Sequence, residues 1–305
     1  MTGHAVVIGE ALIDLLESAD EWLYRPAVGG APLNVAVGIA RLGGRSEFVG
    51  SLGDDPLGAR IRAFLAAAGV GTGGTVNAAG VPTTLAVTTF SGAEPQFRFY
   101  GSPPSYGLLT EADLDPALVA GAGVLYCGSI GLLCPPVLAT ARRAWAMRGP
   151  VRAFDPNIRP SIGFDRAVVA EFAATADLVK LSAADALALY GEGPQQTAAR
   201  LAALGAGTVV VTQGAAGALV VHDGASVLVP APAVEAIDAT GAGDATMAGL
   251  LFGILGRGLP ADLAGWAELT RFAVAVAGFV VESPGGATSM PTLDQLRARF
   301  GEQVA

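Results

Sequence analysis

The segment 238–244 constrains this chain most, because its sequence, Asp-Ala-Thr-Gly-Ala-Gly-Asp, places two acidic residues around a run of very small ones. The residues that follow, Ala245 to Leu255, are almost all small or apolar, which predicts a buried helix. The glycines then lie in the first turn of this helix, where free N–H groups and the positive end of the helix dipole favour an anion. Glycine also lets the backbone approach an anion closely, so the segment predicts an anion-binding turn.

Asp244 is the unexpected member of this turn, because a carboxylate beside an anion is repelled by it. One interpretation is that Asp244 accepts the proton of a nucleophile that attacks the anion. The other is that Asp244 caps the helix, as aspartate often does at a helix start. The spacing of the residues does not decide between the two.

A second glycine-containing segment lies near the start of the chain, where residues 29–34 have the sequence Gly-Gly-Ala-Pro-Leu-Asn and lead into a predicted helix. Gly29 and Gly30 would let the backbone approach a sugar, and Asn34 can both donate to and accept from sugar hydroxyls. An ordinary turn is the alternative interpretation of the two glycines.

Local patterns predict the order of the remaining elements. Ala5 to Gly9 is typical of a buried strand that ends at glycine, and Thr83–Thr89 with Gln96–Tyr100 is typical of a hairpin. From Val124 to Val211, predicted strands and helices alternate, which indicates parallel strands with right-handed crossovers. A long apolar helix is predicted from Glu268 to Val281.

The two glycine-containing segments resemble the signatures of the ribokinase-like sugar kinases, the PfkB carbohydrate kinase family, whose C-terminal pattern is close to Asp-Thr-x-Gly-Ala-Gly-Asp. Ala239 is the one departure from that pattern. The resemblance extends from Gly9 to Pro291 and implies an α/β fold, a ribokinase-like three-layer α/β/α arrangement with a central, mostly parallel sheet. It also implies a single kinase domain over residues 1–305, with a discontinuous small β-sheet lid from about 10–30 and 80–106.

The resemblance implies an enzyme that transfers the γ-phosphate of ATP to a sugar hydroxyl. Asp244 would be the general base, and the backbone N–H groups at the helix start would hold the transferring phosphoryl group. The resemblance assigns that helix start to Gly241, Ala242 and Gly243, together with Asp244. It assigns the sugar contacts to Asp14, Gly29, Gly30, Asn34, Asn157 and Arg159.

ATP, Mg²⁺ and K⁺ are the cofactors that the resemblance implies. The ATP contacts would come from loops after predicted strands, through Lys180, Ser182, Thr212, Gly214 and Gly217. Asp185 stands where the family has a glutamate associated with Mg²⁺, and its side chain is one methylene shorter. Asp238 and Thr240 would enclose the monovalent cation, which the resemblance implies to be K⁺, together with the loop 282–291.

The identity of the sugar is left open by two opposing patterns. The Gly-Gly-Ala-Pro-x-Asn segment and the Asp-Pro-Asn-x-Arg segment at 155–159 resemble fructokinase-like members, which favours fructose or a related ketose. The segment 99–106 departs from their Phe-Tyr-Arg-x-Pro-x-Ala-Asp pattern, because Gly101 replaces the arginine and Ser105-Tyr106 replaces the Ala-Asp pair. A 2-keto-3-deoxygluconate kinase, a ribokinase and a nucleoside kinase therefore remain alternatives.

Two other classes of protein are alternatives to a kinase. A dinucleotide-dependent dehydrogenase could use Gly241 and Gly243 as a turn, but the first predicted strand is not followed by Gly-x-Gly-x-x-Gly. A catalytically inactive sugar-binding regulator would have no need of Asp244. Both classes are thus less well supported by the sequence than a kinase.

The composition restricts the partners. A net charge of −9 argues against nucleic acid and anionic membranes, so we expect a sugar and ATP as the partners. Lys180 is the only lysine, so no Gly-Lys-Ser/Thr phosphate loop exists. The longest uncharged apolar run, 272–281, is too short to span a bilayer, and residues 1–17 lack the basic start of a signal peptide. We expect a cytoplasmic enzyme, and a homodimer through the lid is one option for its oligomeric state.

Overall fold

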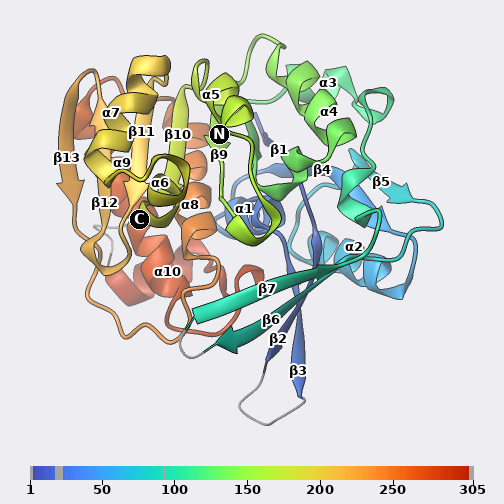
Figure 1. Cartoon of the computed structure of the whole chain (residues 1–305). Helices are drawn as coiled ribbons and strands as arrows, with labels where there is room; N and C mark the ends of the chain where they lie inside the picture. Colours follow the sequence, from blue (N-terminus) through green and yellow to red (C-terminus); the bar gives the residue numbers. More distant parts are fainter. Residues whose placement is uncertain (1–2, 18–22, 92–93, 302–305) are drawn as a thin grey trace.

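The computed structural model of the protein describes residues 3–17, 23–91 and 94–301. A large sheet forms the body and has helices on both faces, while a small sheet projects from one side of the body (Figure 1). This arrangement is the ribokinase-like α/β/α fold with a second, smaller sheet that the sequence predicts. The alternation of strands and helices after Val124 does give parallel strands, as expected.

Within the described residues the large sheet has nine strands, in the order β13-β12-β11-β10-β9-β8-β1-β4-β5. In chain order these strands are β1 (Ala5–Ile8), β4 (Ser46–Gly53), β5 (Thr75–Ala78), β8 (Val124–Gly128), β9 (Val151–Asp155), β10 (Leu178–Ser182), β11 (Thr208–Thr212), β12 (Ala218–His222) and β13 (Ala225–Val229). Every pair from β11 to β5 is parallel, whereas β12 pairs antiparallel with both β11 and β13. The carboxyl ends of the parallel strands therefore lie along one edge of the body.

Helices cover both faces of the large sheet (Figure 1). One face carries α1 (Ala31–Arg41), α2 (Pro56–Ala67), α8 (Ala242–Arg257) and α9 (Leu263–Val280), with α10 (Leu293–Phe300) against α9. The opposite face carries α3 (Pro116–Ala120), α4 (Pro135–Trp145), α5 (Arg166–Ala173), α6 (Ala183–Tyr190) and α7 (Pro194–Leu204). The sheet is thus the middle of three layers.

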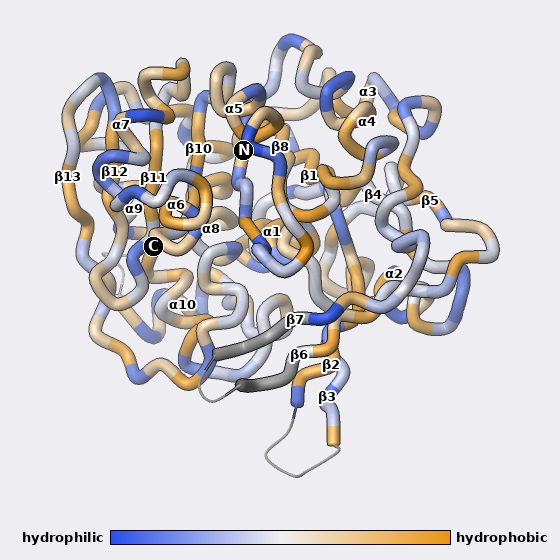
Figure 2. Tube along the Cα trace, viewed as in Figure 1, coloured by the Kyte–Doolittle hydropathy of each residue, from blue (hydrophilic) through white to orange (hydrophobic). Residues whose placement is uncertain are grey.

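Alternation along each central strand builds two apolar layers, because successive side chains point to opposite faces of the sheet. In β1, Ala5 and Val7 belong to the layer under α1 and α8, whereas Val6 and Ile8 belong to the layer under α4 and α7. Figure 2 shows apolar residues inside the body and polar residues at many of the outer turns. The strands are buried on both sides, which explains their nearly continuous apolar sequences.

The small sheet has the strand order β3-β2-β6-β7 within the described residues. Its strands are β2 (Leu12–Glu17), β3 (Tyr24–Gly29), β6 (Leu85–Ser91) and β7 (Glu94–Tyr100). The pair β2–β6 is parallel, and the pairs β2–β3 and β6–β7 are antiparallel. These strands come from the two segments predicted for the lid, and the predicted hairpin is β6–β7. That the small sheet closes over a sugar stays a prediction.

The helix α9 begins earlier than the sequence predicts, at Leu263 instead of Glu268. The side chain of Asp262 accepts the N–H of Gly265 at 2.8 Å and caps the additional turn, which the apolar pattern does not reveal. By length and composition α9 is the one helix of residues 3–17, 23–91 and 94–301 that could cross a membrane. However, 56% of it is buried inside the body, where it packs against α8, β12 and β13 as a core helix does.

Candidate active site

The carboxyl edge of the parallel strands brings together segments that lie far apart in the sequence. Asp155 ends β9 beside Gly128 of β8, and Ser182 ends β10 beside Thr212 of β11. The helix α8 begins near the same edge, because a Cβ added at Gly243 in its first turn would lie 2.7 Å from the Nζ of Lys180 on β10. Ligands of open α/β sheets bind outside this edge, so we place the candidate active site here.

The turn before α8 has the conformation that the glycine-rich sequence predicts. Gly241 is left-handed, with φ 79° and ψ −1°, and Ala242 is the first helical residue. A Cβ at position 241 would lie 2.7 Å from the Cα of Gly286, so a side chain here would collide with backbone as well as strain its own. The turn therefore depends on glycine for two separate reasons.

Two backbone N–H groups of this turn are left to hold an anion. The N–H of Ala242 donates to the carbonyl oxygen of Ala239 at 3.2 Å. Among the described residues, no acceptor contacts the N–H of Gly243 or of Asp244. Of the three predicted phosphoryl-binding N–H groups, that of Ala242 is already hydrogen-bonded within the protein. Those of Gly243 and Asp244 remain available to a ligand at the helix start.

Asp244 is held by a residue from the other end of the chain. Its Oδ2 accepts a hydrogen bond of 2.7 Å from the Nδ2 of Asn34 in α1, and its side chain is buried. No hydrogen bond within the described residues joins the Asp244 carboxylate to an N–H of its own helix, which disfavours the capping interpretation. The Oδ1 of Asn34 is buried and has no hydrogen-bond partner in the described part of the chain, so it is available to a ligand.

The groups around Asp244 have opposing effects on the pKa of its carboxyl. Burial raises the pKa of Asp244 above its ordinary value. The ammonium of Lys180, the hydrogen bond from Asn34 and the guanidinium of Arg159 oppose that rise, whereas the charge of Asp185 adds to it. A raised pKa makes a carboxylate a stronger base, provided that it stays ionised at the working pH.

Asp14 approaches the same space from β2 of the small sheet. A Cβ at position 29 would lie 1.9 Å from the Oδ2 of Asp14, so the carboxylate occupies the room that Gly29 leaves. Burial raises the pKa of Asp14 to about 7, Arg159 lowers it and Asp244 raises it further. The charges of Asp14, Arg159 and Asp244 therefore act on one another, and the structure brings these predicted site residues together.

Glu10 is a site residue that the sequence did not single out. Its Oε1 accepts the N–H of Ala31 at 3.2 Å and its Oε2 accepts the N–H of Gly131 at 3.0 Å, which joins the start of α1 to the loop after β8. A Cβ at Gly30 would lie 2.5 Å from the carbonyl oxygen of Glu10, so this contact also fixes the predicted sugar-binding turn. Burial raises the pKa of Glu10 to about 7. Its signal in the sequence is an acidic residue directly after a buried strand and a glycine.

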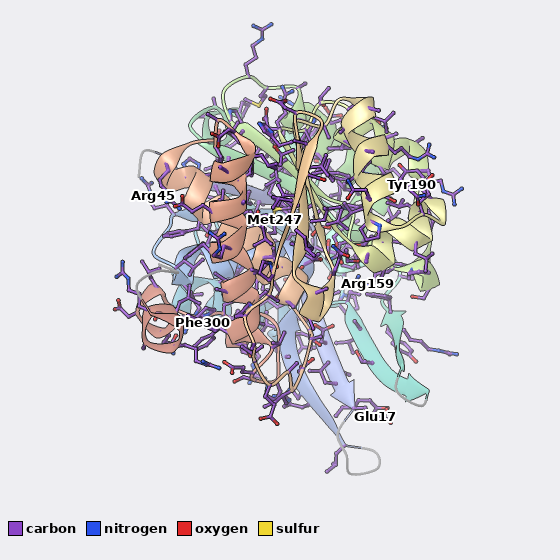
Figure 3. The ribbon with its side chains drawn as sticks, turned by 90° about the vertical axis from the view of Figure 1, so that its left-hand side faces the viewer. Glu17, Arg45, Arg159, Tyr190, Met247 and Phe300 are labelled. Carbon is purple, nitrogen blue, oxygen red and sulfur yellow. The ribbon has the colours of Figure 1, made fainter. Side chains whose placement is uncertain are left out.

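The loop after β9 places Asn157 and Arg159 at the junction of the two sheets. The Nη1 of Arg159 donates to the Oδ1 of Asn157 at 2.7 Å, and the Nδ2 of Asn157 donates to the Oγ of Ser129 at 3.3 Å. In Figure 3, Arg159 lies where the body meets the small sheet, and Glu17 lies toward the outer end of that sheet. Both predicted sugar-binding residues thus line the side of the site that faces the small sheet.

Asp185 has hydrogen-bond partners for both of its carboxylate oxygens. Its Oδ2 accepts the N–H and the hydroxyl of Ser182, at 2.8 and 2.7 Å, which caps α6. Its Oδ1 accepts the N–H of Ile158 at 2.8 Å and so ties α6 to the loop that carries Asn157 and Arg159. The geometry gives Asp185 and Ser182 a structural task, while their contacts with Mg²⁺ and ATP stay predictions.

The turn between β11 and β12 contains the other predicted ATP contacts. The N–H of Gln213 donates to the carbonyl oxygen of Gly217 at 2.7 Å and closes the turn around Gly214. A Cβ at Gly217 would lie 2.0 Å from the carbonyl oxygen of Val229, so this glycine is required by the hairpin itself. Thr212 lies beside Ser182 at the carboxyl edge, which leaves the turn next to the candidate active site.

Asp238 joins the turn before α8 to the loop after α9. Its Oδ1 accepts the N–H of Thr240 at 2.9 Å and its Oδ2 accepts the N–H of Gly285 at 3.0 Å. Burial would raise the pKa of Asp238, but these hydrogen bonds hold it below its ordinary value. The contact of Asp238 and Thr240 with a monovalent cation stays a prediction.

The chemistry available at this edge narrows the class of protein. Asp244 can take a proton where the neighbouring N–H groups of α8 can hold an anion, which is what transfer of a phosphoryl group to a hydroxyl requires. The pattern of the pfkB family of carbohydrate kinases matches residues 3–293, so the chain belongs to the pfkB family of carbohydrate kinases. The protein is accordingly an ATP-dependent sugar kinase, with a sugar and ATP as its small-molecule substrates.

Individual relatives agree with this assignment over almost the whole chain. The chain is 37% identical to a fructokinase of Klebsiella pneumoniae, over 97% of this chain and 99% of that protein. It is similar to the crystal structure of a fructokinase with bound ATP from Xylella fastidiosa, with a TM-score of 0.91, 29% identity and full coverage of both chains. A fructokinase from Vibrio cholerae O395 with fructose, ADP and a calcium ion bound has a TM-score of 0.88 and 28% identity, and the match covers 97% of this chain and 98% of that one.

Proposed function

We propose that this kinase phosphorylates fructose and that Asp244 takes the proton of the attacking hydroxyl. The observation that carries the mechanism is the hydrogen bond of 2.7 Å from Asn34 to the buried Asp244 carboxylate. This bond fixes the base directly beside the free N–H groups of Gly243 and Asp244. A sugar hydroxyl and a γ-phosphate can then meet between the base and the helix start.

In the proposed reaction, the oxygen of a sugar hydroxyl attacks the γ-phosphorus of ATP. The bond between that phosphorus and the bridging oxygen breaks, and ADP leaves with the electron pair of that bond. The hydroxyl proton passes to the Asp244 carboxylate. The N–H groups of Gly243 and Asp244 stabilise the charge on the phosphoryl oxygens during the transfer.

The side chains opposite Asp244 suit a ligand with many hydroxyl groups. The Asp14 carboxylate and the unpaired Oδ1 of Asn34 can accept hydrogen bonds, and the Arg159 guanidinium can donate them. Asp14 belongs to the small sheet, so closure of that sheet would bring acceptors to the sugar and exclude water in one movement. The exclusion of water prevents the transfer of the phosphoryl group to water instead of sugar.

We assign the phosphates of ATP to the space between α8 and the turn 212–217, beside Ser182 and Thr212 at the ends of β10 and β11. Among the described residues, no group of three or more His, Cys, Asp or Glu side chains could hold a metal ion. The residues therefore fit a Mg²⁺ that is bound mainly by the ATP phosphates and water, as is common for this ion. When bound, Mg²⁺ neutralises phosphate charge.

A panel of phosphate acceptors tests the proposed substrate. We expect fructose to give the highest kcat/KM in a coupled ADP-release assay, by at least about 10-fold, because misplaced hydroxyls leave buried polar groups unpaired. The panel should contain 2-keto-3-deoxygluconate, ribose and a purine riboside, because 99–106 departs from the fructokinase-like pattern. Turnover of one of these without turnover of fructose would refute the substrate assignment and leave the kinase mechanism intact.

The second proposed cofactor, K⁺, predicts a dependence on the monovalent cation. We expect activity to rise several-fold when tetramethylammonium is replaced by K⁺ at matched ionic strength, because a cation at Asp238 would fix the turn that precedes α8. Asp238→Asn should lose most of this stimulation. The control Asp262→Asn, which changes the residue that caps α9, should keep it. Equal rates in the two salts would remove K⁺ from the proposal.

A further inference from the structure

Lys180, the only lysine of the chain, is buried in the middle of the body. It lies on β10 and is 3% exposed, and its Nζ donates to the Oδ2 of Asp155 at 2.8 Å. The Asp155 carboxylate is itself fully buried. A buried ammonium is costly unless charged groups offset its loss of water, so its position calls for a reason.

The ammonium also lies next to the first turn of α8. A Cβ at Gly243 would lie 2.7 Å from the Nζ of Lys180, so the charge rests against the residue that precedes Asp244. A cation at the N-terminal end of a helix is opposed by the helix dipole. This placement is therefore favourable only if nearby carboxylates outweigh the dipole.

The charged and titratable groups that act on Asp244 come from many elements, and most of them are acidic. They are Glu10 after β1, Asp14 on β2, Tyr126 on β8, Asp155 and Arg159 at and after β9, Lys180 on β10 and Asp185 on α6. Four of these groups are carboxyls and only two are cations. With so many acids close by, Asp244 would tend to hold a proton, and a protonated carboxyl cannot accept the proton of the sugar.

Of the two cations, Lys180 has the larger effect on Asp244. Burial raises the pKa of Asp244, and the charge of Lys180 is the largest influence that opposes this rise. For Lys180 itself, burial would lower the pKa, but Asp155 and Asp244 outweigh that effect and raise the pKa above its ordinary value. Asp155 and Asp244 thus favour the charged form of Lys180.

We propose that Lys180 is a positioning residue for catalysis, whose buried ammonium keeps the Asp244 carboxylate in the ionised form that accepts the sugar proton. This role rests on the proposed function of Asp244 and differs from the contact with ATP that the sequence predicts. The hydrogen bond to Asp155 holds the ammonium in place, and the absence of a side chain at Gly243 leaves room for it. The chain's single lysine therefore acts through the base and not on the phosphates.

The pH dependence of Lys180→Met tests the proposal. Loss of the ammonium lets the pKa of Asp244 rise, so the acidic limb of kcat/KM for the sugar should move to higher pH by about one unit or more. On the acidic limb the rate should fall about 10-fold for each unit by which the limb moves, and it should recover at more alkaline pH, where the base is ionised again. The KM for ATP should change less than about threefold, because no phosphate contact is lost.

Lys180→Met/Asp155→Asn is the second variant, because the single change leaves Asp155 without its partner and could prevent folding. The double variant removes both buried charges. It should still move the acidic limb upward, by less than the single variant, since the loss of Asp155 acts in the opposite direction. The proposal would be overturned if the acidic limb of kcat/KM did not move in either variant while the rate fell equally at every pH. A KM for ATP that rises 10-fold or more would overturn it as well.

The uniqueness of Lys180 provides a direct measurement that does not depend on activity. In tag-free protein grown with ¹⁵N-lysine, one side-chain ammonium signal is expected, because the sequence holds one lysine. Its chemical shift should follow a titration step that disappears in Asp244→Asn. Persistence of every step in that variant would overturn the coupling of Lys180 to Asp244. If Asp244→Asn stays active while the step is lost, the proposed base is wrong and the coupling is right.

Discussion

Asp244→Asn is expected to lower kcat by at least about 100-fold, because general-base catalysis contributes roughly 10² to 10⁴ in rate. The asparagine keeps an oxygen that can accept the hydrogen bond from the Nδ2 of Asn34, so the start of α8 should keep its shape. What is lost is the acceptor for the sugar proton. The KM for ATP should change little, because the base acts in the transition state. Steady-state kinetics with fructose and ATP measure both constants.

A matched substitution separates catalysis from helix capping. Asp262 caps α9 far from the reacting groups, and Asp262→Asn should leave kcat within about twofold because asparagine caps as well as aspartate. If Asp244→Asn behaved like Asp262→Asn, with near-normal kcat and a normal melting temperature, Asp244 would be a structural residue only. The two interpretations differ by about two orders of magnitude in kcat.

Gly241→Ala is expected to give the second largest effect, a fall of about 100-fold in kcat/KM for ATP. A left-handed alanine costs about 1 to 2 kcal/mol of stability. In addition, its Cβ would lie 2.7 Å from the Cα of Gly286, so the backbone of the turn must move. Such a movement displaces the free N–H groups of α8, and the loss of one comparable donor costs about 10² to 10³ in rate. Kinetics at varied ATP and thermal unfolding measure the two effects separately.

Gly191→Ala is the control for the backbone strain alone. Gly191 ends α6 in a left-handed conformation, with φ 66° and ψ 21°, and a Cβ there would meet nothing within 4 Å. It should lose a similar amount of stability, about 1 kcal/mol, and keep its kcat/KM for ATP. If both variants lost activity to the same extent, general destabilisation would explain the result and the anion-binding turn would not.

The sequence by itself determines the fold and the position of the candidate catalytic turn, because both depend on local signals. Alternating strand and helix patterns specify parallel strands, whose carboxyl ends must share an edge. The segment 238–244 specifies a helix start with left-handed glycine, since only glycine adopts that conformation without strain. The match of residues 3–293 to the pfkB family confirms the resemblance seen in residues 29–34 and 238–244.

Only the tertiary structure decides which polar groups meet and which are buried. The bond between Asn34 and Asp244 joins residues 210 positions apart, and no local pattern contains it. Asp185 and Glu10 accept backbone N–H groups of distant segments, and no local pattern identifies these partners.

Lys180 shows most clearly why this part could not be predicted. The family resemblance implies an ATP contact for Lys180, yet packing removes its ammonium from water and places it near the charges of Asp155 and Asp244. Burial and neighbouring charge are properties of the folded chain, because both depend on which distant segments pack together. The sequence therefore locates the candidate site, and packing decides which charges surround each of its groups.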